Sequence, residues 1–236
     1  MSDKHQAIRS GSPLIRVRDL AKVYTNGAGA VPVLKGIELD VYPGEMVAIM
    51  GPSGTGKSTL LFILGLLLSP TQGSYFALGK DMLKLDRSAQ AQFRRQRFGF
   101  VFQSCNLVEN STVYENIELP LIYARVNPRE RHGKIEEALA KVNLSNRMHH
   151  RSNCLSGGEQ QRVAIARAFV NQPDIILADE PTGQLDRGHS DIIMGYFNQF
   201  VDNKHTAVVI VTHDQEVGKQ CTRVHHLEYG TFNSHD

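Results

Sequence analysis

The chain has 236 residues, of which 41% are hydrophobic and 21% are charged, and this balance is that of a folded globular protein with a sizeable core. Its formal net charge of +2 provides no broad basic field for nucleic acid, and we interpret the local cluster of Arg94, Arg95 and Arg97 as a solvated helix face. The three cysteines form no CxxC pair, which argues against a disulfide framework or a structural zinc site and favours a reducing cytosol.

The first part of the chain is rich in predicted strands. Residues 14–20 and 33–41 alternate as half-buried strands do, and a turn then leads into an apolar strand that ends at Met50. A glycine-rich loop and a helix over 57–67 follow. The apolar run at 60–68 is far shorter than the roughly 20 residues that span a bilayer, so we interpret it as a buried helix and expect a soluble chain.

The rest of the chain alternates helices and strands. Helical patterns occupy 88–97 and 128–142, and apolar strands return at 174–179, 206–212 and 222–230, with a helical pattern at 191–201. Apolar strands that alternate with helices predict a parallel sheet covered on both faces. We therefore expect an α/β core with an N-terminal β-rich portion and an inserted helical region.

The segment GPSGTGKST at 51–59 predicts a phosphate-binding loop. Its glycines let the backbone approach a ligand, and its N–H groups face the β- and γ-phosphates at the positive end of the following helix. Lys57 adds a point charge, the Ser58 hydroxyl is placed to bind Mg²⁺, and Thr59 lies toward the α-phosphate. The strand before it and the helix after it favour this interpretation over an ordinary glycine-rich turn. The predicted nucleotide contacts are Gly51, Pro52, Ser53, Gly54, Thr55, Gly56, Lys57, Ser58 and Thr59.

Two carboxylates follow the predicted strand at 174–179. Asp179 at its carboxyl end would hold Mg²⁺ through water, and Glu180 would polarise a water that attacks the γ-phosphate. Taken alone, the pair could equally be a helix cap with solvent-exposed charge, and the nearby phosphate loop favours the catalytic interpretation.

A second anion-binding helix start is predicted at Ser156-Gly157-Gly158, within the segment LSGGEQ. It has no lysine of its own, and the chain already holds a complete phosphate loop. The second site makes sense if it serves a nucleotide that another copy holds.

With these motifs in this order, the chain closely resembles the nucleotide-binding subunits of ABC transporters from about residue 14 to 230. The resemblance implies a P-loop NTPase (RecA-like) α/β core with an N-terminal antiparallel β-subdomain and an inserted helical subdomain. It implies a single ATPase domain over 1–236. Within it, 14–103 hold the β-subdomain and the Walker A loop, 104–165 the helical subdomain with the signature motif, and 166–230 the Walker B segment and the switch histidine.

The resemblance also assigns roles to single residues. Tyr24 is expected to stack on adenine, although a surface aromatic is an alternative. Gln103 is expected to touch Mg²⁺ and to link to the membrane partner, although a polar residue at a strand end is an alternative. His213 is expected to contact the γ-phosphate, although a structural histidine is an alternative. Asp186 is expected to communicate across a dimer. The implied catalytic residues are Lys57, Glu180 and His213, the metal ligands are Ser58, Gln103 and Asp179, and the contacts to the partner copy's nucleotide are Ser156, Gly157, Gly158 and Glu159.

The resemblance implies an ATPase that uses ATP and Mg²⁺ and closes as a head-to-tail dimer around two nucleotides. A separate transmembrane permease would dock near Gln103 and the helical subdomain, which places the chain at the cytoplasmic face of the inner membrane. The segments VPVLKGI and ENIELPL look most like the branch of macrolide-efflux and lipoprotein-release ATPases, which favours export. The alternative is a cell-division type of cassette that signals across the membrane without moving a substrate.

Overall fold

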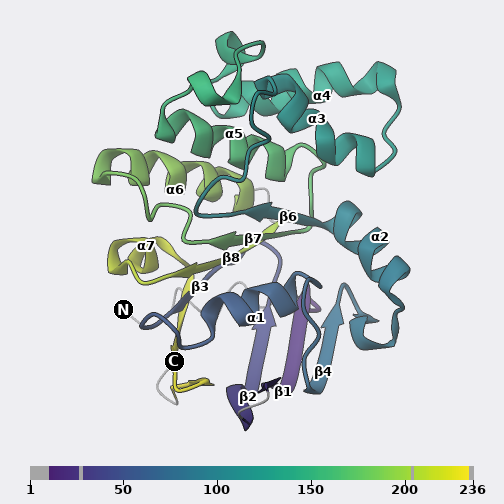
Figure 1. Cartoon of the computed structure of the whole chain (residues 1–236), viewed down its shortest axis with the longest axis vertical. Coiled ribbons are helices and arrows are strands. Elements are labelled where there is room, and N and C mark those ends of the chain that lie inside the picture. Colours follow the sequence, from purple (N-terminus) through teal and green to yellow (C-terminus); the bar gives the residue numbers. More distant parts are fainter. Residues whose placement is uncertain (1–10, 27–28, 203–204, 234–236) are drawn as a thin grey trace.

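The computed structural model describes residues 11–26, 29–202 and 205–233 (Figure 1). Its centre is a six-stranded sheet in the order β10-β9-β3-β8-β7-β6, in which neighbouring strands are parallel except for β10 at the edge. The parallel strands are β3 (Met46–Met50), β6 (Phe98–Val101), β7 (Ile175–Asp179), β8 (Ala207–Thr212) and β9 (Arg223–Glu228), and β10 is Thr231–Phe232.

Both faces of this sheet are buried, because alternate residues of each strand enter different hydrophobic clusters. In β8, Val208 and Ile210 pack into the cluster with the upper helices of Figure 1, whereas Val209 and Val211 pack into the cluster with α1. The predicted parallel sheet covered on both faces is confirmed. The helices of the first cluster include α3 (Val113–Tyr123), α4 (Pro128–Lys141), α5 (Gly157–Phe169) and α6 (Arg187–Val201).

An antiparallel sheet covers the opposite side. Its order is β2-β1-β4-β5, and α1 (Lys57–Leu64) lies between it and the central sheet in Figure 1. The Lys35 N–H donates to the Gly230 carbonyl at 2.8 Å and so ties this sheet to the β9–β10 turn. The strands are β1 (Ile15–Asn26), β2 (Gly29–Val41), β4 (Gln72–Ala77) and β5 (Lys80–Asp81).

Several boundaries differ from the predicted ones. The helix expected over 57–67 ends at Leu64, because Leu66 adopts a left-handed φ of 57° that stops helical hydrogen bonding. The helix expected over 88–97 is α2 (Arg87–Arg97), and Asp86 caps it by accepting from the Ala89 N–H at 2.7 Å. Elements without a predicted counterpart include β4, β6, α3 and α7 (Gln215–Gln220).

The arginine cluster of α2 is less solvated than we expected. Arg94 is half-buried and donates to the Leu66 carbonyl at 2.7 Å, and Arg95 is also half-buried, so these two stems pack against the fold. Arg97 is exposed and pairs with Asp174 at 3.1 Å. Throughout the described ranges, no helix is both long enough and apolar enough to cross a membrane.

Candidate ATP-binding and hydrolysis site

The phosphate loop connects β3 to α1 at the carboxyl edge of the central sheet. Gly51 has a φ of 152°, and a Cβ there would collide with the Leu227 carbonyl of β9. Only glycine satisfies that approach without strain. The side chain of Lys57 folds over the loop and donates from Nζ to the carbonyls of Gly51 and Pro52, each at 2.8 Å. The ammonium is therefore already held where the loop would receive phosphate oxygens.

Asp179 lies at the end of β7 and faces the start of α1. The Ser58 hydroxyl donates to Asp179 Oδ1 at 3.2 Å, which joins two of the three expected metal ligands. Burial raises the pKa of Asp179, and the charge of Glu180 adds to this, while the Ser58 hydrogen bond and the Lys57 charge oppose it. Hydroxyl and carboxylate oxygens are hard donors, and this donor set fits Mg²⁺.

Glu180 is held at both carboxylate oxygens by the end of the neighbouring strand β8. Oε2 accepts from the Thr212 hydroxyl at 3.1 Å, and Oε1 lies 2.8 Å from His213 Nδ1. The backbone of Glu180 adopts a left-handed φ of 45°, a strained conformation for a residue other than glycine. Its side chain contacts Thr212 and His213, whereas that of Asp179 contacts Ser58. The structure thus places Glu180 and His213 in direct contact.

Gln103 reaches the loop that follows Glu180. A Cβ added to Gly183 would lie 3.1 Å from Gln103 Nε2 and 3.5 Å from the Glu180 Cβ, so the amide and the glutamate flank the same glycine. The chain thus brings the end of β6 next to the end of β7, as parallel neighbours do.

Tyr24 lies on the β1–β2 hairpin. The residue is 42% exposed and pairs across the strands with Val31, and the Lys22 ammonium lies 5.1 Å from the centroid of its ring. Further along β2, the side chain of Val33 would lie 3.0 Å from a Cβ at Gly56 of the phosphate loop. The strand that pairs with Tyr24 therefore also passes beside the phosphate loop.

The signature segment begins α5. Ser156 is its N-cap and forms a capping box with Glu159: the Glu159 N–H donates to Ser156 Oγ at 3.3 Å, and Glu159 Oε2 accepts from the Ser156 N–H at 2.9 Å. Glu159 Oε1 also accepts from Arg147 at 3.0 Å. The hydrogen bond from the Ser156 backbone is the main cause that lowers the pKa of Glu159. Glu159 thus fixes the shape of the helix start that carries Gly157 and Gly158.

Two positioning residues were missed in the sequence. Thr212 holds Glu180, and the buried Gln161 donates from Nε2 to the Pro181 carbonyl at 2.7 Å, one residue after Glu180. Gln161 Oε1 also accepts from the Cys105 thiol at 2.6 Å. Thr212 directly precedes His213, which was a usable signal, whereas nothing local in the sequence indicates the contacts of Gln161.

Comparison with known proteins identifies the class of protein that has this fold and site. The family model described as ABC transporter matches residues 34–183. The dimeric structure of MJ0796, a bacterial ABC transporter cassette, superposes with a TM-score of 0.86 at 40% identity and covers 93% of this chain and 96% of that one. A post-hydrolysis dimer of the same cassette bound to ADP and Pi gives a TM-score of 0.86 at 39% identity. The chain belongs to the ABC transporter family and is an ATP-binding cassette with ATPase activity, and the predicted P-loop fold class is confirmed.

Curated relatives indicate the branch of this family. The macrolide export ATP-binding/permease protein MacB of Marinobacter nauticus is 49% identical over 214 residues, which are 91% of this chain and 33% of that protein. MacB of Escherichia coli is 46% identical over 219 residues, which are 93% of this chain and 34% of that protein. The chain thus spans about a third of the length of these relatives and matches the macrolide-export branch.

Proposed function

We propose that two copies of this chain form an ATP-driven clamp that powers a transmembrane permease in export. The observation that carries the proposal is Glu180, held by Thr212 and His213 at the tip of β7 beside the phosphate loop. This is the arrangement that a base for attack of water on a γ-phosphate requires. The similarity to macrolide-export proteins supports export over a signalling role of the cell-division type.

In this proposal, ATP binds along the loop at 51–59 with its adenine on Tyr24. Lys57 exchanges its two carbonyl partners for phosphate oxygens, a stronger charge-assisted contact. The residues that would hold Mg²⁺ are Ser58, Asp179 and Gln103. When bound, Mg²⁺ would neutralise charge on the β- and γ-phosphate oxygens.

Glu180 accepts the proton of the attacking water in the same scheme. Thr212 keeps the Glu180 carboxylate oriented, because the Thr212 hydroxyl donates a hydrogen bond to Glu180 Oε2. In its imidazolium form His213 has a donor on each ring nitrogen, so Nδ1 can donate to Glu180 while the opposite ring nitrogen donates to the γ-phosphate. One histidine can thus align the base and the phosphate together, and Lys57 stabilises the charge that develops during transfer.

The second copy completes each site from the start of its α5. The N–H groups of Gly157 and Gly158 and the hydroxyl of Ser156 face the nucleotide of the partner, and Glu159 maintains the capping box that presents them. ATP then favours the closed dimer because it contacts both copies only in that state. We propose the following subdomains for this cycle: the β-subdomain and phosphate loop comprise residues 14–103, the helical subdomain comprises residues 104–165, and the rest of the core comprises residues 166–230.

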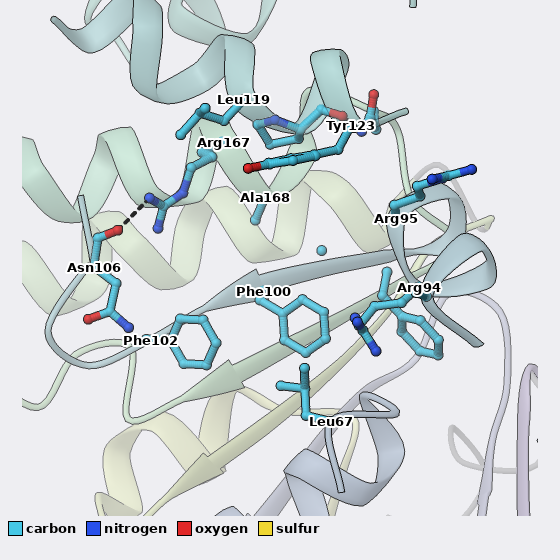
Figure 2. A pocket seen from close by; sticks show the side chains of 15 residues that line it. Leu67, Arg94, Arg95, Phe100, Phe102, Asn106, Leu119, Tyr123, Arg167 and Ala168 are labelled. Atoms are coloured by element: carbon cyan, nitrogen blue, oxygen red, sulfur yellow. Dashed lines mark hydrogen bonds between the residues drawn. The ribbon is translucent and has the colours of Figure 1, made fainter. Parts of the chain in front are cut away.

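A cavity of about 580 Å³ near Gln103 supports a docking site for the permease (Figure 2). Phe100, Phe102, Leu67 and Tyr123 give it an apolar lining, and none of the described residues that line it is acidic. Figure 2 shows the arginines of α2 and α5 around it. We infer that its occupant is a short segment of the permease with an apolar face and a carboxylate, at the cytoplasmic face of the inner membrane.

Glu180→Gln tests the ATPase mechanism. The amide has nearly the same size and shape as the carboxylate but cannot accept a proton. We therefore expect phosphate release to fall about 10²- to 10⁴-fold. ATP binding should persist, and a dimer should accumulate. Single-turnover phosphate release and light scattering in Mg-ATP measure both effects. Glu137→Gln, an exposed change on α4, is the control. Hydrolysis at the parent rate in the Glu180 variant would refute the catalytic assignment.

A further inference from the structure

His189 lies in the first turn of α6, one helical turn after Asp186. Its backbone N–H donates to Asp186 Oδ1 at 3.0 Å, and its ring Nδ1 lies 2.7 Å from Asp186 Oδ2. One residue therefore occupies both oxygens of the aspartate. The backbone bond is an ordinary helix cap that any residue at 189 would make, whereas the ring bond is specific to a side chain with a donor of this reach.

The other edge of the same ring contacts the signature segment. A Cβ added to Gly158 would lie 3.0 Å from His189 Cδ2 and 3.5 Å from Nε2, so the ring packs directly on the second residue of α5. That contact is van der Waals in nature, and it leaves no room for a larger residue at 158 unless the ring moves.

The ring of His189 thus connects two segments that we place at the interface of the proposed dimer. Asp186 belongs to the loop between Glu180 and α6, and Gly158 belongs to the helix start proposed to bind the nucleotide of the second copy. In the monomer both segments are solvent-facing, and the Asp186 and His189 side chains are 69% and 58% exposed. Hydrogen bonds across such exposed side chains contribute little to the stability of a monomer, so stability alone does not account for the arrangement.

We propose that His189 is a positioning residue that fixes Asp186 and Gly158 relative to one another, so that both reach the partner copy as one preorganised surface. The proposal rests on the ATP-sandwich dimer proposed above. A surface that is already ordered loses less conformational entropy when the dimer closes. His189 should therefore affect the ATP concentration needed for closure, but not the binding of nucleotide to the phosphate loop of its own copy.

Three variants separate this role from simple helix stability. His189→Leu keeps an apolar side chain against Gly158 but removes the donor to Asp186, whereas His189→Asn restores a short side-chain donor. His132→Leu is the matched control: His132 pairs with Glu136 on α4 at 3.3 Å, and its side chain has the same 58% exposure as that of His189.

All variants are made in the Glu180→Gln background, and dimer formation is followed by light scattering as Mg-ATP is titrated. We expect His189→Leu to raise the ATP midpoint of dimerisation about tenfold, as the loss of a charge-assisted hydrogen bond predicts. His189→Asn should recover most of the shift, and His132→Leu should show none. Binding of a fluorescent ADP analogue to the monomer and the melting temperature should stay at the parent values.

Dimerisation of His189→Leu at the parent ATP midpoint would overturn the positioning role while leaving the dimer proposal intact. A parallel loss of ADP binding, not restored by His189→Asn, would also overturn it, because the effect would then be one of folding. If the Glu180→Gln parent stays monomeric at saturating ATP, the sandwich dimer and this inference fall together.

Discussion

Asp179 and Glu180 are consecutive carboxylates placed in different surroundings. Asp179 is hydrogen-bonded to Ser58 at the start of α1. Burial there raises the pKa of Asp179, and only Ser58 and Lys57 favour its charged form. Glu180 has a left-handed backbone conformation, and its carboxylate is held by Thr212 and His213. Two neighbouring carboxylates in such different environments can take different roles. Here one carboxylate suits cation binding and the other suits proton transfer.

Asp179→Asn should stabilise the fold and inactivate the enzyme. Because the pKa of Asp179 is higher in the folded than in the unfolded chain, its stabilising contribution is present at low pH and is lost as the pH rises through the folded pKa. At neutral pH the buried charge is thus unfavourable, and a neutral amide should raise the melting temperature at pH 7.5 more than at pH 4.5. ATP hydrolysis should fall about 100-fold or more, because an amide replaces the anionic ligand.

Thermal unfolding at the two pH values and phosphate release test this prediction, with Asp191→Asn on the exposed face of α6 as the control. A melting temperature that falls at pH 7.5 in the Asp179 variant would show that the carboxylate is net stabilising and would contradict the prediction.

At the scale of elements, α5 connects the signature segment to the loops on either side of the site. Gln161 near its start binds the Pro181 carbonyl and the Cys105 thiol, and Arg167 near its end donates to the Asn106 carbonyl at 2.7 Å. Burial lowers the pKa of Arg167, as expected for a guanidinium enclosed between helix and loop. A shift of α5 would therefore move the backbone next to Glu180 and the loop after Gln103 together.

Gln161→Leu tests this connection. The similar volume preserves packing, but the Pro181 carbonyl and the Cys105 thiol lose their buried partner, so we expect a loss of about 1–3 kcal/mol of unfolding free energy. Hydrolysis should fall further than ATP affinity, because Pro181 positions Glu180 whereas the phosphate loop is untouched. Urea unfolding and single-turnover hydrolysis measure the two effects. Gln220→Leu at the exposed end of α7 is the control, and an equal loss in both variants would contradict the connection.

Local chemistry explains which parts of the fold and site the sequence could predict. The phosphate loop, the carboxylates after β7 and the helix start at Ser156 depend on neighbours in the chain, so their spacing alone indicates their role. The strand β6 was missed because its four residues, Phe98–Val101, are too few to show a period. The helix α3 was missed because Pro120 interrupts its helical pattern, although Thr112 and Glu115 form a capping box at its start. The contacts of Gln161 and His189 join segments that only the tertiary fold brings together.

At the scale of the whole molecule, the cavity of Figure 2 lies where α2, β6, α3 and α5 meet. It therefore touches both the sheet that holds the nucleotide and the helices that carry the signature segment. Arg94 and Arg167 are engaged by backbone carbonyls, whereas Arg95 lies at the edge of the cavity with its Nε buried and without a hydrogen-bond partner among the described residues. A partner segment seated here would meet positive charge that no carboxylate of the lining offsets.

Arg95→Glu should separate docking from catalysis. Arg95 lines the cavity and not the nucleotide site, so the isolated variant should hydrolyse ATP at the parent rate. Charge reversal at the cavity edge should repel the acidic permease segment proposed above, and co-purification of the permease should fall at least about tenfold. The measurement is a pull-down from native membranes with tagged Glu180→Gln protein in Mg-ATP, with and without Arg95→Glu, followed by mass spectrometry of the permease. Arg129→Glu at the exposed start of α4 is the matched charge reversal. Equal recovery of permease by all three proteins would remove this cavity from the docking surface and leave the ATPase assignment untouched.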